Sequence, residues 1–130
     1  VEHHLRLLPA EVAAKLDESV VLVLPSWPEG LGRVVIEAFA RARGVIATSA
    51  AGVADLVDDG VEGILIPRAD TDALASALVS VLTDRELALS LSQAAGERYD
   101  SWHSTPQDFA QRLRELVDAV LRESSCGSCS

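Results

Sequence analysis

The chain has 130 residues, a net charge of −9 and 48% hydrophobic residues, of which only two Trp, one Tyr and two Phe are aromatic. This composition predicts one globular domain with an aliphatic core. The negative charge argues against a nucleic acid or an anionic membrane surface as the main partner, and no apolar run approaches the ~20 residues of a membrane span.

The first half of the chain alternates predicted strands and helices. In chain order we expect a short strand at 3–8, a helix at 9–16, a strand at 20–24, a helix at 31–43, a strand at 45–48, a short helical segment at 53–57 and a strand at 63–66. The run Val20–Leu24 is apolar, rich in β-branched residues and closed by Pro25, which is typical of a strand buried on both faces.

The second half is predicted to be helical. Asp70 or Thr71 caps a helix whose Leu74, Leu78 and Leu82 fall on one stripe. The residues from Thr83 to Glu86 resemble a capping box that opens a further helix. Thr105 with Pro106 starts the last one.

This order of elements predicts an α/β fold, with a parallel sheet covered by helices on both faces. Ligands of such sheets bind beyond the carboxyl ends of the strands, where the loop Pro25–Gly32 lies. We expect a partial Rossmann-like domain at 1–98, its C-terminal helix at 99–123 and a disordered tail at 124–130. The tail carries Cys126 and Cys129, a lone pair that lacks the second pair a zinc site would need.

The segment SWPEGLGRVVIEAF, residues 26–39, contains the strongest functional signal. Glu29 and Glu37 are separated by seven residues, the first in a Pro/Gly loop and the second inside an apolar helix. Glycines permit a close approach of the backbone to a ligand, and a helix start directs free N–H groups at an anion. Together these features indicate a site for a phosphorylated, hydroxyl-rich ligand.

Each glutamate also has a simpler interpretation. Glu29 suits the N-terminal end of a helix dipole. Glu37 stands four residues before Arg41, an order in which an exposed ion pair contributes about 0.3–0.5 kcal/mol. We expect the acids Asp55, Asp58, Asp59 and Glu62 to form a solvated turn, the histidines His3, His4 and His103 to be surface or packing residues, and Trp102 to pack in the core.

The segments 25–26, 29–32 and 37–40 resemble the signature of retaining, family-4-type glycosyltransferases (glycosyl transferases group 1). The resemblance continues through 45–48, 52–57 and 59–67 and covers roughly residues 9–123. It implies most of the C-terminal, donor-binding half of a two-domain GT-B enzyme. Such an enzyme transfers a sugar from a nucleotide diphosphate sugar, such as a UDP- or GDP-sugar, to an acceptor hydroxyl with retention.

The resemblance also implies roles for residues of this chain. Glu29 would act as the catalytic-site contact to the donor sugar, and Glu37 would accept the ribose hydroxyls. The remaining contacts, to phosphate and sugar oxygens, would come from Gly30, Leu31, Gly32, Arg33 and Val34. No metal and no cofactor beyond the substrate is expected, because helix-start amides and basic residues elsewhere carry the diphosphate charge.

The chain departs from the family at several positions. The family usually has glycine where this chain has Ala42, proline at Gly44, paired glycines at 51–52 and often glutamate at Asp55. The chain also has no methionine, which indicates a piece of a longer polypeptide. The resemblance implies that the piece lacks the acceptor-binding N-terminal domain and would be inactive alone. Relatives imply a cytoplasmic location, at times at the cytoplasmic face of a membrane.

Two alternatives remain open from the sequence. One is a non-catalytic module, truncated from a donor domain, that binds a nucleotide or only another protein. The other is a sugar-nucleotide epimerase on the same fold, which a basic, histidine-bearing site would favour and which this segment does not show.

Overall fold

The computed structural model describes residues 3–4, 6–27, 30, 32–50, 52–102 and 104–126, with side chains through residue 122. Three parallel strands, β1 (Val21–Leu24), β2 (Gly44–Thr48) and β3 (Gly63–Ile66), form a sheet in the order β1-β2-β3. The expected α/β fold with a parallel sheet is confirmed.

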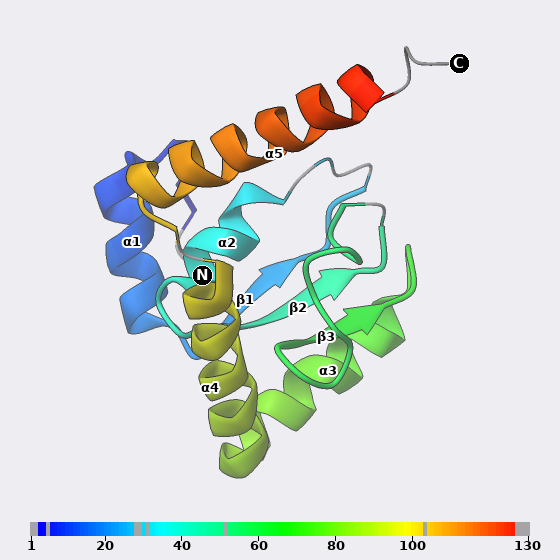
Figure 1. The fold of residues 1–130 in the computed structure, drawn as a ribbon. Coiled ribbons are helices and arrows are strands. Elements are labelled where there is room, and N and C mark those ends of the chain that lie inside the picture. Colours follow the sequence, from blue (N-terminus) through cyan, green and yellow to red (C-terminus); the bar gives the residue numbers. More distant parts are fainter. Residues whose placement is uncertain are drawn as a thin grey trace.

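Helices lie on both faces of the sheet in the described part of the chain (Figure 1). They are α1 (Pro9–Glu18), α2 (Arg33–Phe39), α3 (Thr71–Thr83), α4 (Arg85–Trp102) and α5 (Pro106–Cys126). Helices α2 and α3 contact the sheet, while α4 contacts β2 and both of these helices. Figure 1 shows α5 crossing the molecule beyond α2, away from α3. None of the helices among the described residues is both long and apolar enough to cross a bilayer.

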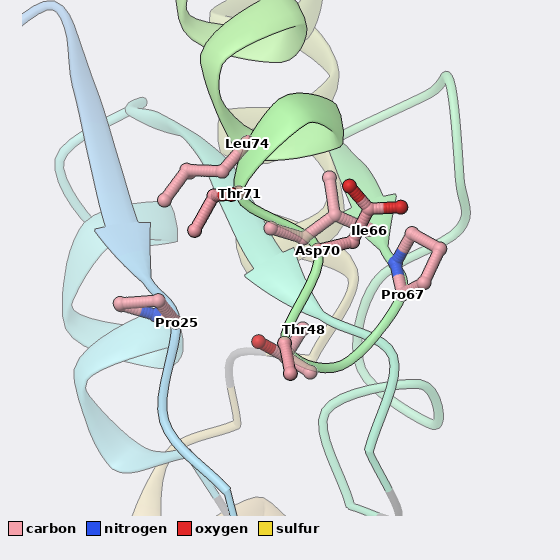
Figure 2. Close-up of a pocket in the computed structure, with 8 residues that line it drawn as sticks. Pro25, Thr48, Ile66, Pro67, Asp70, Thr71 and Leu74 are labelled. Atoms are coloured by element: carbon pink, nitrogen blue, oxygen red, sulfur yellow. The ribbon is translucent and has the colours of Figure 1, made fainter.

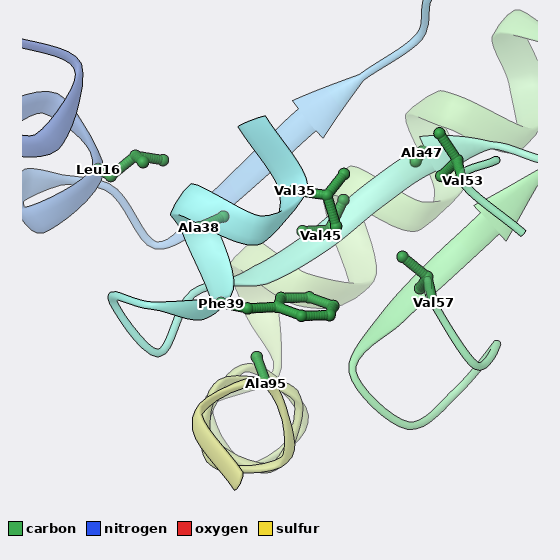
Figure 3. Packing of buried hydrophobic residues seen from close by; sticks show 9 residues of the cluster. All are labelled: Leu16, Val35, Ala38, Phe39, Val45, Ala47, Val53, Val57 and Ala95. Atoms are coloured by element: carbon green, nitrogen blue, oxygen red, sulfur yellow. The ribbon is translucent and has the colours of Figure 1, made fainter. Parts of the chain in front are cut away.

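The central strand β2 divides the core into two clusters. Val45 and Ala47 point to the cluster that contains Phe39 of α2 and Ala95 of α4 (Figure 3). Ile46 points the other way, toward the second cluster. The main buried partners in that cluster are Ala77 and Val81 of α3 and Leu91 of α4. The alternation follows from the two-residue period of a strand, and it accounts for the complete burial of β2.

The three strands end at the same edge. Leu24 pairs with Ala47, and Ala47 pairs in turn with Leu65, so the loops that follow the strands begin side by side. The loop after β1 and the loop after β3 thus flank the end of β2. This is the edge at which parallel sheets bind ligands.

The start of the chain differs from the prediction. Described residues between 3 and 8 are not in a strand, and Leu8 instead precedes α1, its N–H donating to Glu11 Oε2 at 2.6 Å. Strand β1 is half-buried, not buried on both faces, because β2 is its only neighbour in the described sheet. The run 53–57 forms successive turns where a short helix was expected.

Helix α2 is shorter than the predicted 31–43 and ends at Phe39. Ala42 adopts a left-handed conformation with φ 48°. The N–H of Arg43 then donates to Ala38 O at 2.9 Å, and that of Ala42 to Phe39 O at 2.9 Å, which closes the helix end. The sequence signal was Gly44, but the chain reverses two residues earlier.

Two details of the later helices also differ. The buried positions of α3 are Ala77 and Val81, while Leu82 of the predicted stripe is 63% exposed. The residue that caps α4 is Asp84, whose Oδ1 accepts from the N–H groups of Glu86 and Leu87 at 3.0 Å. Thr83 belongs to α3 and donates to Val79 O, so the expected capping box is wrong. Asp70 caps α3 as predicted, accepting from the N–H of Ala73 at 2.8 Å.

The C-terminal region contains two helices. Helix α4 ends at Trp102, and Thr105 exchanges hydrogen bonds with Asp108 at the start of α5, as expected. Helix α5 extends to Cys126, so the first part of the predicted tail 124–130 is helical. Residues 127–130, including Cys129, lie outside the described residues, as does His103.

Candidate functional site

The start of α2 requires a glycine. Gly32 stands at the N-cap with φ 52° and ψ 47°, in the left-handed region. A Cβ there would lie 3.2 Å from Val53 Cγ2 and 3.4 Å from Val35 Cγ2. Backbone conformation and close packing therefore both disfavour a side chain at this position. Gly32 brings the beginning of α2 against the turn that follows β2.

The other residues of the predicted site have different surroundings. Glu29 and Leu31 lie outside the described residues. Gly30 is exposed, and a Cβ at this position would meet nothing within 4 Å. Arg33 and Val34 form the first turn of α2, with Arg33 exposed and Val34 half-buried. The backbone conformation and packing at position 32 thus explain why this residue is glycine, whereas packing does not explain the glycine at position 30.

Glu37 is exposed although its helix is largely apolar. The predicted pair with Arg41 is absent, because Arg41 Nη1 contacts Asp17 Oδ2 of α1 at 2.6 Å instead. Within the described part of the chain, the Glu37 carboxylate has no ion pair or hydrogen bond. It lines a groove of about 240 Å³ between α1 and α2, together with Pro9, Ala13, Leu16, Ala40 and Arg41.

A second pocket, which the sequence did not single out, lies at the carboxyl edge on the α3 side (Figure 2). Its volume is about 190 Å³, and its lining includes Pro25, Thr48, Ile66, Asp70, Thr71 and Leu74. Beside it, the Arg68 guanidinium lies 3.7 Å from the centroid of the Trp27 ring. The sequence indicates where the three strands end, and this pocket lies at that edge. It does not indicate the lining residues, because they come from two separate loops.

Glu62 contradicts the expectation of a wholly solvated acidic turn. It is 3% exposed, and its Oε2 accepts from the N–H of Asp58 at 2.9 Å. Arg98 of α4 places Nε 3.4 Å from Glu62 Oε1 and Nη2 3.4 Å from Asp58 Oδ2. Arg98 also lies over the ring of Trp102, at 5.0 Å. The acid next to β3 therefore joins this turn to α4.

The remaining candidates behave as surface or packing groups. Asp55, Asp58 and Asp59 are exposed, and Asp59 Oδ1 accepts from the N–H of Leu65 at 2.8 Å. His3 and His4 are exposed. Trp102 contacts Phe39, with ring centroids 5.9 Å apart, but it is 37% exposed, so it lies at the edge of the core and not inside it as expected. Among the residues that the structure describes, no three His, Cys, Asp or Glu side chains gather as metal ligands would.

Comparison with known proteins places these features in a family. Residues 2–84 match Glycosyl transferases group 1. D-inositol 3-phosphate glycosyltransferase of Corynebacterium glutamicum is 32% identical over 134 residues, which cover 98% of this chain and 31% of that protein.

Solved structures agree in fold. Sucrose-phosphate synthase from Thermosynechococcus elongatus aligns with a TM-score of 0.73 at 32% identity, covering 84% of this chain and 28% of that one. A mutant of S. aureus TarM, solved in complex with fondaparinux, alpha-GlcNAc-glycerol and UDP, aligns with a TM-score of 0.71 at 25% identity. This alignment covers 79% of this chain and 21% of the TarM chain. The chain thus spans 21% to 31% of the length of these proteins.

Proposed function

The chain belongs to the group 1 glycosyltransferases, and we propose that it forms the donor-binding part of an enzyme that transfers a sugar from a nucleotide diphosphate sugar to an acceptor hydroxyl. The observation that carries this proposal is Glu37. Its carboxylate is exposed in the groove between α1 and α2 and is not paired with a described residue. A free carboxylate accepts two neighbouring hydroxyls, as the ribose of a nucleotide presents them.

The start of α2 supplies the second part of the proposed site. The first N–H groups of a helix have no partner inside the helix, so those of Arg33 and Val34 are available to phosphate or sugar oxygens. Gly32 keeps this end free of a side chain. Arg33 and Glu37 are separated by four residues, about one helical turn or ~6 Å along the axis. One face of α2 thus suits a ligand with both an anionic and a hydroxyl-bearing part.

The proposed mechanism depends on positioning and electrostatics. Glu29 orients the donor sugar, Glu37 holds the ribose, and the amides at the start of α2 with Gly30 and Leu31 contact phosphate and sugar oxygens. The bond between the anomeric carbon and the diphosphate breaks on the face where the acceptor hydroxyl attacks, so the configuration is retained. Oriented amides stabilise the departing diphosphate without a metal in this scheme.

The comparisons support the donor class. The structure of S. aureus TarM, a protein to which this chain is similar, contains UDP. The matched relatives extend well beyond the region that this chain spans. We propose that the acceptor site and the cationic groups for the diphosphate come from such additional sequence, and that catalysis takes place in the cytoplasm.

The test is a heteronuclear NMR titration of the ¹⁵N-labelled chain with UDP, GDP and their sugar conjugates. We expect saturating shifts at Gly32, Arg33, Val34 and Glu37, and we expect Glu37→Ala to weaken binding about tenfold, because a charged hydrogen-bond acceptor is lost. Glu115→Ala on α5 is the matched control, since Glu115 is exposed and does not line the groove. A well-dispersed spectrum without shifts at α2 would contradict a donor site in this chain.

A further inference from the structure

The pocket on the α3 side of the carboxyl edge contains a polar group that the fold leaves unused. Thr48 is the last residue of β2 and is 4% exposed. No hydrogen bond joins its hydroxyl to any residue that the structure describes. Figure 2 shows the hydroxyl oxygen turned toward the space beside Pro25. The hydroxyl itself is open to the pocket, so water reaches it, and a ligand hydroxyl would take the place of that water.

The walls of the pocket are apolar on one side and polar on the other. Pro25, Ile66 and Leu74 supply the apolar surface, and Asp70 and Thr71 stand at the start of α3. One oxygen of Asp70 accepts from the N–H of Ala73, and Figure 2 shows its carboxylate on the side of Ile66 and Pro67, away from Pro25. The hydroxyl-bearing side chains that line the pocket are those of Thr48 and Thr71. The pocket therefore offers an apolar face and several hydrogen-bonding groups, as small-molecule sites usually do.

The rim of the pocket is formed by two loops that meet across the end of β2. Pro25 and Ala69 line both this pocket and an adjoining one of about 520 Å³, which also contains Trp27 and Arg68. The stacking of Arg68 on Trp27, at 3.7 Å, orients the guanidinium at the rim. Arg68 and Asp70 carry opposite charges, so the pair favours a neutral hydroxylated ligand over an ion of either sign.

The volume limits the size of the ligand. A cavity of 150 Å³ is large enough for benzene, so about 190 Å³ accommodates one six-membered ring. A sugar ring has an apolar C–H face and a hydroxylated edge, which matches the two kinds of wall. We propose that this pocket is a second carbohydrate site that binds one neutral monosaccharide ring, with the side chains of Thr48 and Thr71 contacting its hydroxyls.

This site is separate from the proposed donor site. Gly32 and Glu37 belong to α2, which packs on the face of the sheet with Val45 and Ala47. The pocket contains Leu74 of α3, which packs on the opposite face with Ile46. The two sites share an edge of the sheet but no described residue, so either can be absent without the other.

The test is an NMR titration of the ¹⁵N-labelled chain with methyl α-D-glucopyranoside in the absence of nucleotide. We expect saturating shifts at the amides of Ser49, Ala69 and Ala73 with a millimolar Kd, which is usual for so small a ligand. Shifts at Gly32 and Glu37 should stay small. Glycerol, which has hydroxyls but no ring, should not saturate the same amides. No saturation with the glucoside, or equal saturation with glycerol, would overturn the proposal.

Substitutions provide the second readout. Thr48→Val removes one hydroxyl from a buried strand and should weaken glucoside binding about two- to tenfold. Thr83→Val removes a hydroxyl at the far end of α3, where it donates to Val79 O, and should leave the Kd unchanged. If Thr48→Val perturbs the fold, Thr71→Val replaces it, since Thr71 is exposed at the first turn of α3. An unchanged Kd in a pocket variant, as in the Thr83→Val control, would exclude the substituted threonine as a ligand contact and overturn that part of the proposal.

Discussion

Two glutamates with apolar neighbours in the chain have opposite environments. Glu37 on α2 is exposed and is not paired with a described residue, whereas Glu62 before β3 is 3% exposed and contacts Asp58 and Arg98. Glu37 projects from the outer side of a helix whose inner side holds Val35, Ala38 and Phe39. Glu62 is covered because another helix, α4, places a cation opposite it.

The burial of Glu62 follows from the close pairing of β3 with β2. A Cβ at Gly63 would lie 2.3 Å from Val45 O, so only glycine allows the two strands to approach here. The N–H of Val45 donates to Glu62 O at 3.2 Å, which fixes the backbone of the acid beside β2. Its side chain then meets Arg98 of α4. A carboxylate is therefore buried where the fold places hydrogen-bond donors or cations beside it, whatever residues adjoin it in the sequence.

The largest effect should come from removing the buried acid. Glu62→Ala leaves the N–H of Asp58 without its acceptor and removes one ion-pair partner of the partly buried Arg98, and should lower the free energy of unfolding by about 2–3 kcal/mol. Glu37→Ala should change it by less than about 0.5 kcal/mol. Urea unfolding of both variants measures the difference. An equal loss of unfolding free energy in the two variants would show that the burial of Glu62 does not make it more important for stability than Glu37.

A substitution at the start of α2, the helix that carries Glu37, should have an intermediate effect on the free energy of unfolding. Gly32→Ala introduces a side chain at φ 52°, 3.2 Å from Val53, and should cost about 1–2 kcal/mol. Gly30→Ala is the matched control and should cost less than about 0.5 kcal/mol, since no atom lies within 4 Å of its Cβ position. Thermal unfolding distinguishes them, and a cost at Gly30 as large as at Gly32 would contradict the assigned geometry.

A substitution at the end of α2 should have the smallest effect, and it should stabilise the fold. Ala42 has φ 48°, so Ala42→Gly relieves strain and should raise the free energy of unfolding by about 0.5–1 kcal/mol. The same substitution at Ala75, inside α3, should lower it by about 1 kcal/mol. Calorimetry on the two variants gives the signs. A destabilised Ala42→Gly variant would mean that packing of the Ala42 methyl group outweighs the strain.

The sequence predicts well where one local signal decides the structure. The apolar runs of β2 and β3 and the cap at Asp70 are of this kind, and all three are confirmed. The end of α2 was placed too late because a left-handed alanine carries no signal in the chain. Glycine, the residue that favours this conformation, is absent at position 42.

The candidate site was predicted in part for the same reason. Gly32 and Glu37 belong to one motif, and the structure places the first at a position that favours glycine and the second in an exposed groove. Thr48 and Arg68 were missed because their environment is made by loops far apart in the sequence. Glu62 was misassigned because its partner Arg98 stands 36 positions later, on α4. Such long-range contacts are visible only in the folded chain.

The groove beside Glu37 is tied more firmly at one end than at the other. Arg43 donates to Leu16 O and Asp17 O at 2.9 Å, and Arg41 contacts Asp17, so the last turn of α1 is fastened to the segment after α2. Pro9, at the opposite end of α1, lines the same groove. The end of the groove at Arg41 is therefore held by side-chain hydrogen bonds between the two segments, whereas Pro9 makes no such bond to α2 among the described residues.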